Sequence, residues 1–247
     1  MFSLVKKYPF WIAVGFFLLV HTGPAWGIDA DLHLGASGIT QGEFKDFSKE
    51  AGLAISYIPA APAEPLGITG FDIGIEATVA DIREDRSYWS KITSDPPSVL
   101  IIPKLHAQKG LPFGFDVGLV FSKVPQSNIS MIGGEIKWAY LAGNTALPAI
   151  AVRGSYTRLL GVGDLNLETI GADLSISKGL AFVTPYAGYG QVWIQSKEKA
   201  GLGLEQESLS LPKPFIGVKI SLLLINLVLE VDFSEIPLYT GRLNIGF

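Results

Sequence analysis

Four side chains beyond residue 28 are of types that could carry out catalysis: two carboxylates, Asp72 and Glu76, and two histidines, His33 and His106. Asp72 and Glu76 are four positions apart in an alternating segment typical of a β-strand, which separates them by about 13 Å along the strand. That distance is too long for a retaining glycosidase pair and long even for an inverting one. His33 and His106 would have to lie within hydrogen-bond reach of a nucleophile to activate it. The sequence contains no G-x-S-x-G, no H-E-x-x-H and no cysteine, so we expect no enzyme, no cofactor and no metal site.

The overall composition excludes further classes of function. The chain has 247 residues, 19 basic and 23 acidic, so its net charge of -4 gives no reason to expect nucleic acid as a partner. Charged residues make up only 17% of the chain and hydrophobic residues 48%. With no cysteine, neither a disulfide nor a lipid-modified N-terminal cysteine can form.

The first 27 residues have the pattern of a secretory signal peptide. Lys6 and Lys7 supply the positive start, residues 10–20 the apolar core, and residues 25–27 (Ala-Trp-Gly) a small-x-small cleavage site. The apolar core is about 11 residues, against the roughly 20 that a membrane-spanning helix needs. We therefore expect residues 1–27 to be removed on export.

From residue 68 to the end, apolar and polar residues alternate with a period of two. The last segment is representative: Tyr239, Gly241, Leu243, Ile245 and Phe247 share one face, while Thr240, Arg242 and Asn244 share the other. The segments are about ten residues long and are joined alternately by short turns and by longer polar loops, at residues 81–97 and 196–211. This pattern predicts an antiparallel β-meander within residues 67–247.

Residues 28–66 form an N-terminal segment with a different pattern. Thr40 and Glu43 have the spacing of a helix capping box, and Phe44 and Phe47 then fall on one face of a short helix over residues 41–50. The two aromatic rings are either the packing side of this helix or the wall of a site for an apolar ligand. Residues 28–39 and 53–58 are either two further strands or part of a plug, and we favour the strands.

Together these features resemble the outer-membrane β-barrel proteins of Gram-negative bacteria. The resemblance rests on the signal peptide, the alternating strands, the segment VTPYAGYG (residues 183–190) and the terminal YTGRLNIGF (residues 239–247). It implies an all-β fold, an antiparallel transmembrane β-barrel of about ten to twelve strands with a short N-terminal helix. It further implies location in the outer membrane, contact with its lipid, a periplasmic C-terminus, and an assembly signal read by the barrel-assembly machinery at Tyr239, Leu243, Ile245 and Phe247. Aromatic residues near strand ends, Trp89, Trp138, Tyr140, Tyr156, Trp193 and Tyr239, would form the interfacial girdles.

If the apolar face of each strand meets lipid, charges of both signs must lie in the lumen. The predicted lumen-lining residues are Asp72, Glu76, Asp116, Glu135, Lys137, Arg153, Asp173, Lys219, Glu230, Asp232 and Arg242, with Lys104 beside them. They form either a packed network of ion pairs or the lining of a narrow hydrated pathway. We expect a channel or transporter for a small solute. The alternative is a structural or interaction barrel without transport, whose outer loops bind partners.

Overall fold

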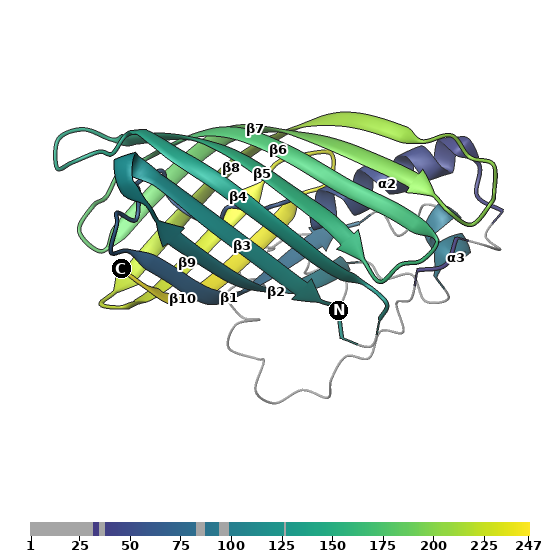
Figure 1. The fold of residues 1–247 in the computed structure, drawn as a ribbon, viewed down its shortest axis with the longest axis horizontal. Helices are drawn as coiled ribbons and strands as arrows, with labels where there is room; N and C mark the ends of the chain where they lie inside the picture. Colours follow the sequence, from purple (N-terminus) through teal and green to yellow (C-terminus); the bar gives the residue numbers. More distant parts are fainter. Residues whose placement is uncertain (1–31, 35–37, 83–86, 94–98, 126) are drawn as a thin grey trace, which may run out of the picture.

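The fold is given by a computed structural model that describes residues 32–34, 38–82, 87–93, 99–125 and 127–247. The expected signal peptide, residues 1–27, lies outside the described residues. Ten antiparallel strands close into a single barrel in which each strand pairs with its neighbours in sequence and β1 pairs with β10 (Figure 1). The strands are β1 (Phe71–Asp81), β2 (Val99–Gly110), β3 (Phe115–Lys123), β4 (Ser130–Leu141), β5 (Ala149–Leu160), β6 (Leu165–Ser177), β7 (Val183–Glu198), β8 (Glu207–Leu222), β9 (Ile225–Asp232) and β10 (Leu238–Gly246).

The period of two in the sequence becomes the two sides of the barrel wall. Along β2, Leu105 is 59% exposed on the outside, whereas its neighbours Lys104 and His106 are buried inside. Along β10, Leu243 and Ile245 face out while Arg242 and Asn244 face in. An apolar outer surface around a polar interior is the reverse of a soluble barrel and is the arrangement of barrels that cross a bilayer. The predicted fold class is confirmed.

The connections between strands lie at two ends of the barrel. What we call the turn end carries residues 67–70, 111–114, 142–148, 178–182 and 223–224, together with the C-terminus. What we call the loop end carries, among the described residues, 82, 87–93, 124–125, 127–129, 161–164, 199–206 and 233–237. The loop predicted at residues 196–211 is wrong in its bounds, because β7 and β8 continue as a paired hairpin to Ser196 and Glu207. The outward-facing side chains of this part of the hairpin are polar, among them Gln195, Lys197 and Ser208. Its sequence therefore has the polar composition of a loop.

In its described residues, the N-terminal segment forms a plug and contributes no strand. The helix α2 (Gln41–Ile55) begins at the predicted capping box of Thr40 and Glu43, and it runs five residues beyond the expected end. The strand predicted at residues 53–58 is therefore wrong, because Leu53 and Ile55 continue the buried face of the helix. The described parts of residues 28–39 are not in a strand either. The barrel has ten strands, at the lower bound of the expected range.

Beyond α2, the chain continues as an extended segment, residues 56–66, which we call the strap. The strap runs inside the barrel from the end of α2 to the turn end, where the chain reverses into β1 (Figure 1). Its residues 56–63 are all buried. The N-terminal segment thus enters at the loop end, passes through the lumen and leaves at the turn end.

The interior of the barrel has two layers. At the loop end, α2 and the short helix α3 (Ser87–Ile92) pack into an apolar core with inward residues of the wall, among them Ile102, Met131, Leu167 and Ile194. Around the strap, the inward residues are charged and polar. Among the described residues, no helix is long and apolar enough to cross a membrane.

Between β1 and β2, where the sequence predicts an outer loop with a girdle tryptophan, the described helix α3 packs into this apolar core. Trp89 of α3 is buried, its ring centroid lies 5.4 Å from that of Phe47, and its Nε1 donates to Glu50 Oε2 at 2.9 Å. The girdle prediction for Trp89 is therefore wrong, because the ring has a partner inside the barrel. Trp138, Tyr140, Tyr156 and Trp193 are exposed on the outer surface.

Candidate functional site in the lumen

The predicted lumen residues all project from the wall towards the barrel interior. Those that are buried are Asp72, Glu76, Asp116, Glu135, Lys137, Arg153, Glu230, Asp232 and Arg242. Asp173 and Lys219 are partly buried on inward positions of β6 and β8. They come from eight different strands, and Lys104 on β2 adds a ninth. The closed register of the wall, and no local motif, therefore brings them together.

Most of these charges lie within ion-pair distance of an opposite charge. The Nζ of Lys104 is 2.9 Å from Glu76 Oε1, and the Nζ of Lys137 is 2.8 Å from Asp116 Oδ2. The Nε of Arg153 is 2.9 Å from Glu135 Oε2, and its Nη1 is 3.8 Å from Asp173 Oδ2. Breaking a buried pair by removing one partner leaves an uncompensated charge, which costs several kcal/mol. The pairs are therefore interdependent parts of the closed barrel.

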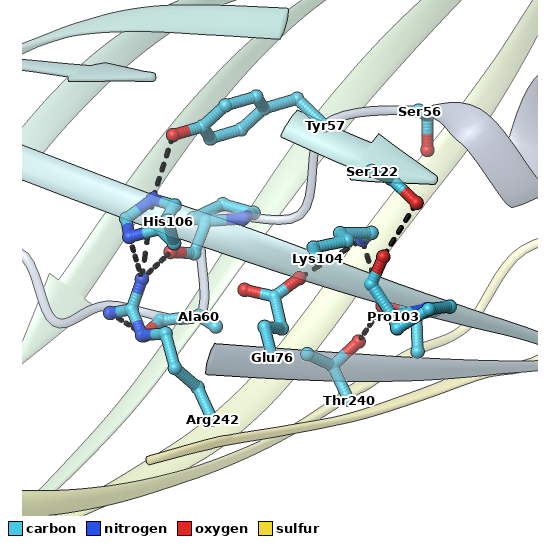
Figure 2. A network of polar contacts seen from close by, with 12 residues as sticks. Ser56, Tyr57, Ala60, Glu76, Pro103, Lys104, His106, Ser122, Thr240 and Arg242 are labelled. Carbon is cyan, nitrogen blue, oxygen red and sulfur yellow. Dashed lines mark hydrogen bonds and ion pairs between the residues drawn. The ribbon is translucent and has the colours of Figure 1, made fainter. Parts of the chain in front are cut away.

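His106 joins the strap to the wall. Its Nε2 is 2.9 Å from the hydroxyl of Tyr57 in the strap, and its Nδ1 is 2.7 Å from Nη1 of Arg242 on β10 (Figure 2). Arg242 also lies 4.0 Å from Asp72 and donates to backbone carbonyls of the strap. All of these groups are buried. The imidazole thus serves as a structural link.

Lys213 is a lumen residue that the sequence reasoning missed. It projects inward from β8, is buried, and its Nζ lies 3.3 Å from Asp232 Oδ1. Lys213 lies just beyond the loop predicted at residues 196–211, and for that reason it is not among the predicted lumen residues. The alternation of Leu209, Leu211, Lys213 and Phe215 is the signal that would have found it. The described wall then contributes to the lumen six basic residues, Lys213 with the five predicted ones, and seven acidic residues.

A small cavity lies between the strap and the wall. A cavity of about 20 Å³ lies beside Ser56, Tyr57 and Pro59 of the strap, and its wall includes Asp173 and Lys213. One water needs roughly 10–15 Å³, so this cavity has room for about one molecule. It is not a continuous path between the two ends.

The aromatic face of α2 packs against protein. Phe44 and Phe47 are fully buried, and the ring of Phe47 also makes an edge contact with Tyr88, at a centroid distance of 6.4 Å. An apolar cavity of about 30 Å³ near Ala51, Ile55 and Trp89 is too small for a ligand with more than a few heavy atoms. Of the two interpretations of these phenylalanines, packing is the one that the structure supports.

No cluster of three or more metal-ligating side chains is found in the part of the chain that the structure describes. The expectation that the protein is not an enzyme and needs no cofactor stays a prediction.

Together, a closed wall, an apolar outer surface and paired charges inside define the architecture of the outer-membrane β-barrel class. This assignment rests on the barrel's own geometry. No family model and no curated protein matches the sequence.

Several solved structures of bacterial proteins are similar to this chain. They include the N-terminal β-barrel domain of Pseudomonas aeruginosa OprF (11% identity, TM-score 0.36, covering 71% of this chain and 97% of that one). Neisserial surface protein A has 9% identity and a TM-score of 0.30, covering 72% of this chain and 94% of that one. Ail, the attachment invasion locus protein of Yersinia pestis, has 14% identity and a TM-score of 0.28, covering 72% of this chain and 95% of that one.

Proposed function

We propose that the protein is an outer-membrane β-barrel that spans the bilayer without conducting solutes in this state, and that it acts through the surface at its loop end. The observation that carries this proposal is the N-terminal segment inside the barrel. Residues 41–66 fill the lumen from the loop end to the turn end. An open pore would need a continuous water path in their place.

The apolar layer makes closure the stable arrangement. Phe44, Phe47, Leu53 and Ile55 on α2 are buried against the wall and α3. Exposing a large apolar side chain to water costs about 1.5–3 kcal/mol. Withdrawing α2 from the lumen would expose these four side chains together, so the helix stays in place unless something else covers them.

Location in the outer membrane is part of the proposal. Export would use residues 1–27 as a cleaved signal peptide. Assembly would use the last strand, on which Leu243 and Ile245 face outward. The terminal Phe247 exchanges backbone hydrogen bonds with Phe71 and so closes the seam between β1 and β10. With the C-terminus in the periplasm, the loop end would face the cell exterior.

The loop end is a fixed surface suited to binding a partner. Gln41 at the start of α2 exchanges hydrogen bonds with the backbone of Glu205 in the β7–β8 loop, at 2.9 and 3.2 Å. Glu43 accepts from Lys91 of α3 at 2.7 and 2.8 Å. Helices and hairpin are therefore joined into one cap, and a preorganised surface loses less conformational entropy on binding.

Recordings in planar lipid bilayers test the closed state. Purified barrel whose folding is verified by heat-modifiable gel mobility should give no reproducible openings. The positive control is Phe47→Asp, which places a carboxylate in the apolar layer and should release α2 and produce openings. Steady openings of the unaltered protein would refute the proposal.

A second candidate function is gated passage of a small solute. It is favoured by the polar contacts of the strap, because hydrogen bonds to lumen side chains can be exchanged for hydrogen bonds to water. In this case the unaltered protein would open when a ligand or an applied voltage displaces the plug. The same recordings, with α2 fixed covalently by a disulfide between Ser48→Cys and Ser196→Cys, separate the two candidates.

A further inference from the structure

The wall of the lumen contacts the strap mainly through the strap's backbone. The side chains that the strap offers between residues 59 and 65 are small or cyclic: Pro59, Ala60, Ala61, Pro62, Ala63 and Pro65, with Glu64 the exception. Ala60, Ala61 and Ala63 are buried without a polar group to contribute. Specific contacts with this stretch must therefore go to its carbonyl and amide groups.

Three buried cations of the wall donate to five strap carbonyls. Lys213 on β8 donates to the carbonyl of Tyr57 at 2.7 Å. Arg242 on β10 donates to the carbonyls of Pro59, at 3.4 Å, and of Ala60 (Figure 2). Lys137 on β4 donates to the carbonyls of Pro62, at 3.2 Å, and of Glu64, at 2.8 Å. The cations follow the strap in order from the end of α2 towards the turn end.

Two side chains of the wall accept hydrogen bonds from backbone amides of the strap. Ser177 Oγ accepts from the amide of Ala63 at 2.9 Å, and the carboxylate of Asp116 accepts from the amide of Leu66 at 3.1 and 3.3 Å. Proline has no amide hydrogen, so Pro59, Pro62 and Pro65 present no donor that the wall must satisfy. The wall therefore accepts from two strap amides, and three further positions of the strap need no acceptor because they are proline.

The three cations also have partners within the wall itself. Lys137 pairs with Asp116 at 2.8 Å, Lys213 with Asp232 at 3.3 Å, and Arg242 lies 4.0 Å from Asp72. Each ammonium or guanidinium would keep a carboxylate partner if the strap were absent. The positions of these donors are thus fixed by the barrel, which is the condition for a preorganised binding site.

We propose that the lower lumen is a binding site for an extended proline- and alanine-rich peptide, with residues 56–66 of the same chain as its resident occupant. The site recognises backbone carbonyls through Lys137, Lys213 and Arg242. It selects small side chains because the alanines of the strap are buried against the wall, with no room beside them for larger side chains. A peptide with this pattern, supplied by another molecule, can take the place of the strap once α2 has left its seat. This inference goes beyond the closed state proposed above.

Two variants release α2, so that the strap is held by its own hydrogen bonds alone and can be displaced, and one variant keeps α2 in place. We call a barrel with α2 released vacated. Phe47→Asp removes the apolar seat of α2. Gly52→Leu does so by steric conflict, because a Cβ at Gly52 would lie 2.5 Å from Cγ2 of Ile194. Ser48→Cys combined with Ser196→Cys locks α2 in place, since the two hydroxyl oxygens are 2.8 Å apart. Heat-modifiable gel mobility verifies that each variant is a folded barrel.

The probe is a fluorescent synthetic peptide of residues 56–67, SYIPAAPAEPLG, whose binding is followed by anisotropy. Saturable binding is expected to the Phe47→Asp barrel, and no binding to the locked barrel. Adding Lys137→Met to the vacated barrel should weaken binding at least about tenfold, because two hydrogen bonds from a charged donor are lost. Lys197→Met, which changes an exposed lysine on the outer face of β7, is the matched control and should leave the affinity unchanged.

Two further readouts identify what is recognised. A peptide in which the three alanines are replaced by leucine should not bind, whereas a peptide that keeps its prolines and alanines but replaces tyrosine by phenylalanine should still bind. No saturable binding to a folded, vacated barrel would overturn the inference, as would equal binding to the Lys137→Met barrel. If Phe47→Asp fails to fold, Gly52→Leu takes its place. A barrel that stays closed in bilayers yet binds no peptide when vacated would overturn this inference alone.

Discussion

Replacing Arg153 by methionine distinguishes a packed lumen from a water-filled one. The Arg153 side chain is only 1% exposed, and its guanidinium lies 2.9 Å from Glu135 and 3.8 Å from Asp173. Methionine preserves much of the length and volume of the side chain but carries no charge. In a water-filled lumen the substitution would alter ion flow and leave stability nearly unchanged.

The magnitude follows from what remains after the substitution. Removing one partner of a buried pair costs about 3–5 kcal/mol, because the other partner stays charged and uncompensated. Glu135 keeps a hydrogen bond from Gln108, and Asp173 is partly exposed, so both retain some compensation. We therefore expect a loss at the lower end, about 3 kcal/mol. Adding Glu135→Gln to Arg153→Met should recover part of this loss, since one of the two unpaired carboxylates is then removed.

Denaturant unfolding in lipid vesicles measures this loss, and bilayer recordings of the same samples measure conductance. Arg158→Met is the matched control, because Arg158 lies on the same strand but is exposed on the outer face. An exposed arginine contributes only about 0–1 kcal/mol through its ion pairs. A change below about 1 kcal/mol for Arg153→Met, or the appearance of openings in the unaltered barrel, would show that the lumen is hydrated and the reasoning wrong.

Two further predictions concern the ends of the barrel. At the loop end, the pKa of Glu43 is lowered from 4.5 to about 2, mainly by the hydrogen bond from Lys91, with Ser87 and Thr40 adding to it. Because the folded pKa lies below the unfolded one, the stabilisation by Glu43 is present above pH 4.5 and is lost as the pH falls towards 2. The difference in melting temperature between the unaltered barrel and Glu43→Gln should shrink over that range, and a difference that stays constant would contradict the assignment. At the turn end, deleting Phe247 removes its backbone hydrogen bonds to Phe71 and a ring contact with a centroid distance of 5.0 Å, so less folded barrel should reach the outer membrane. Normal yield in the membrane fraction would refute the role of Phe247 in assembly.

The barrel wall could be predicted from the sequence because its signal is local. Each strand alternates in the residues themselves, as in β3, where Asp116 faces in and Val117 faces out. The capping box of Thr40 and Glu43 is equally local, and the predicted start of α2 is confirmed. The predicted charges, such as Glu76 and Lys104, lie on inward positions for the same reason.

The sequence offered a plug only as the alternative to two strands, and it could not decide between them because the plug's contacts join residues far apart in the chain. The hydrogen bond from Lys213 to Tyr57 spans 156 positions, and nothing in either segment indicates the other. The error at residues 53–58 has a local cause. Leu53, Ile55 and Tyr57 are spaced like a strand, but over so few residues this spacing also fits the buried face of a helix.

Trp89 and Lys213 were misjudged for a related reason. Inside the loop end, inward wall residues such as Ile102 and Leu167 are apolar, because they meet α2 and α3. On the outer surface at the same end, the hairpin of β7 and β8 is polar. The usual contrast between the two faces of a membrane strand is therefore reversed at this end, and only the position of the plug explains the reversal.

A disulfide between α2 and β7 tests the central claim most directly, since it reports whether the N-terminal segment lies inside the barrel. The chain has no cysteine of its own, so Ser48→Cys with Ser196→Cys introduces one defined pair. The hydroxyl oxygens of these serines are 2.8 Å apart, which places two sulfurs within bonding reach. The control pair, Ser48→Cys with Ser177→Cys, places one cysteine on α2 and the other near the turn end of the barrel. These two cysteines should not cross-link.

With α2 seated in the lumen, mass spectrometry of the folded Ser48→Cys/Ser196→Cys barrel should find nearly complete intramolecular cross-linking, and the control pair should retain two free thiols. A folded, heat-modifiable barrel in which both engineered cysteines remain free would contradict the account, because the helix would then lie elsewhere and the lumen would not be closed by it.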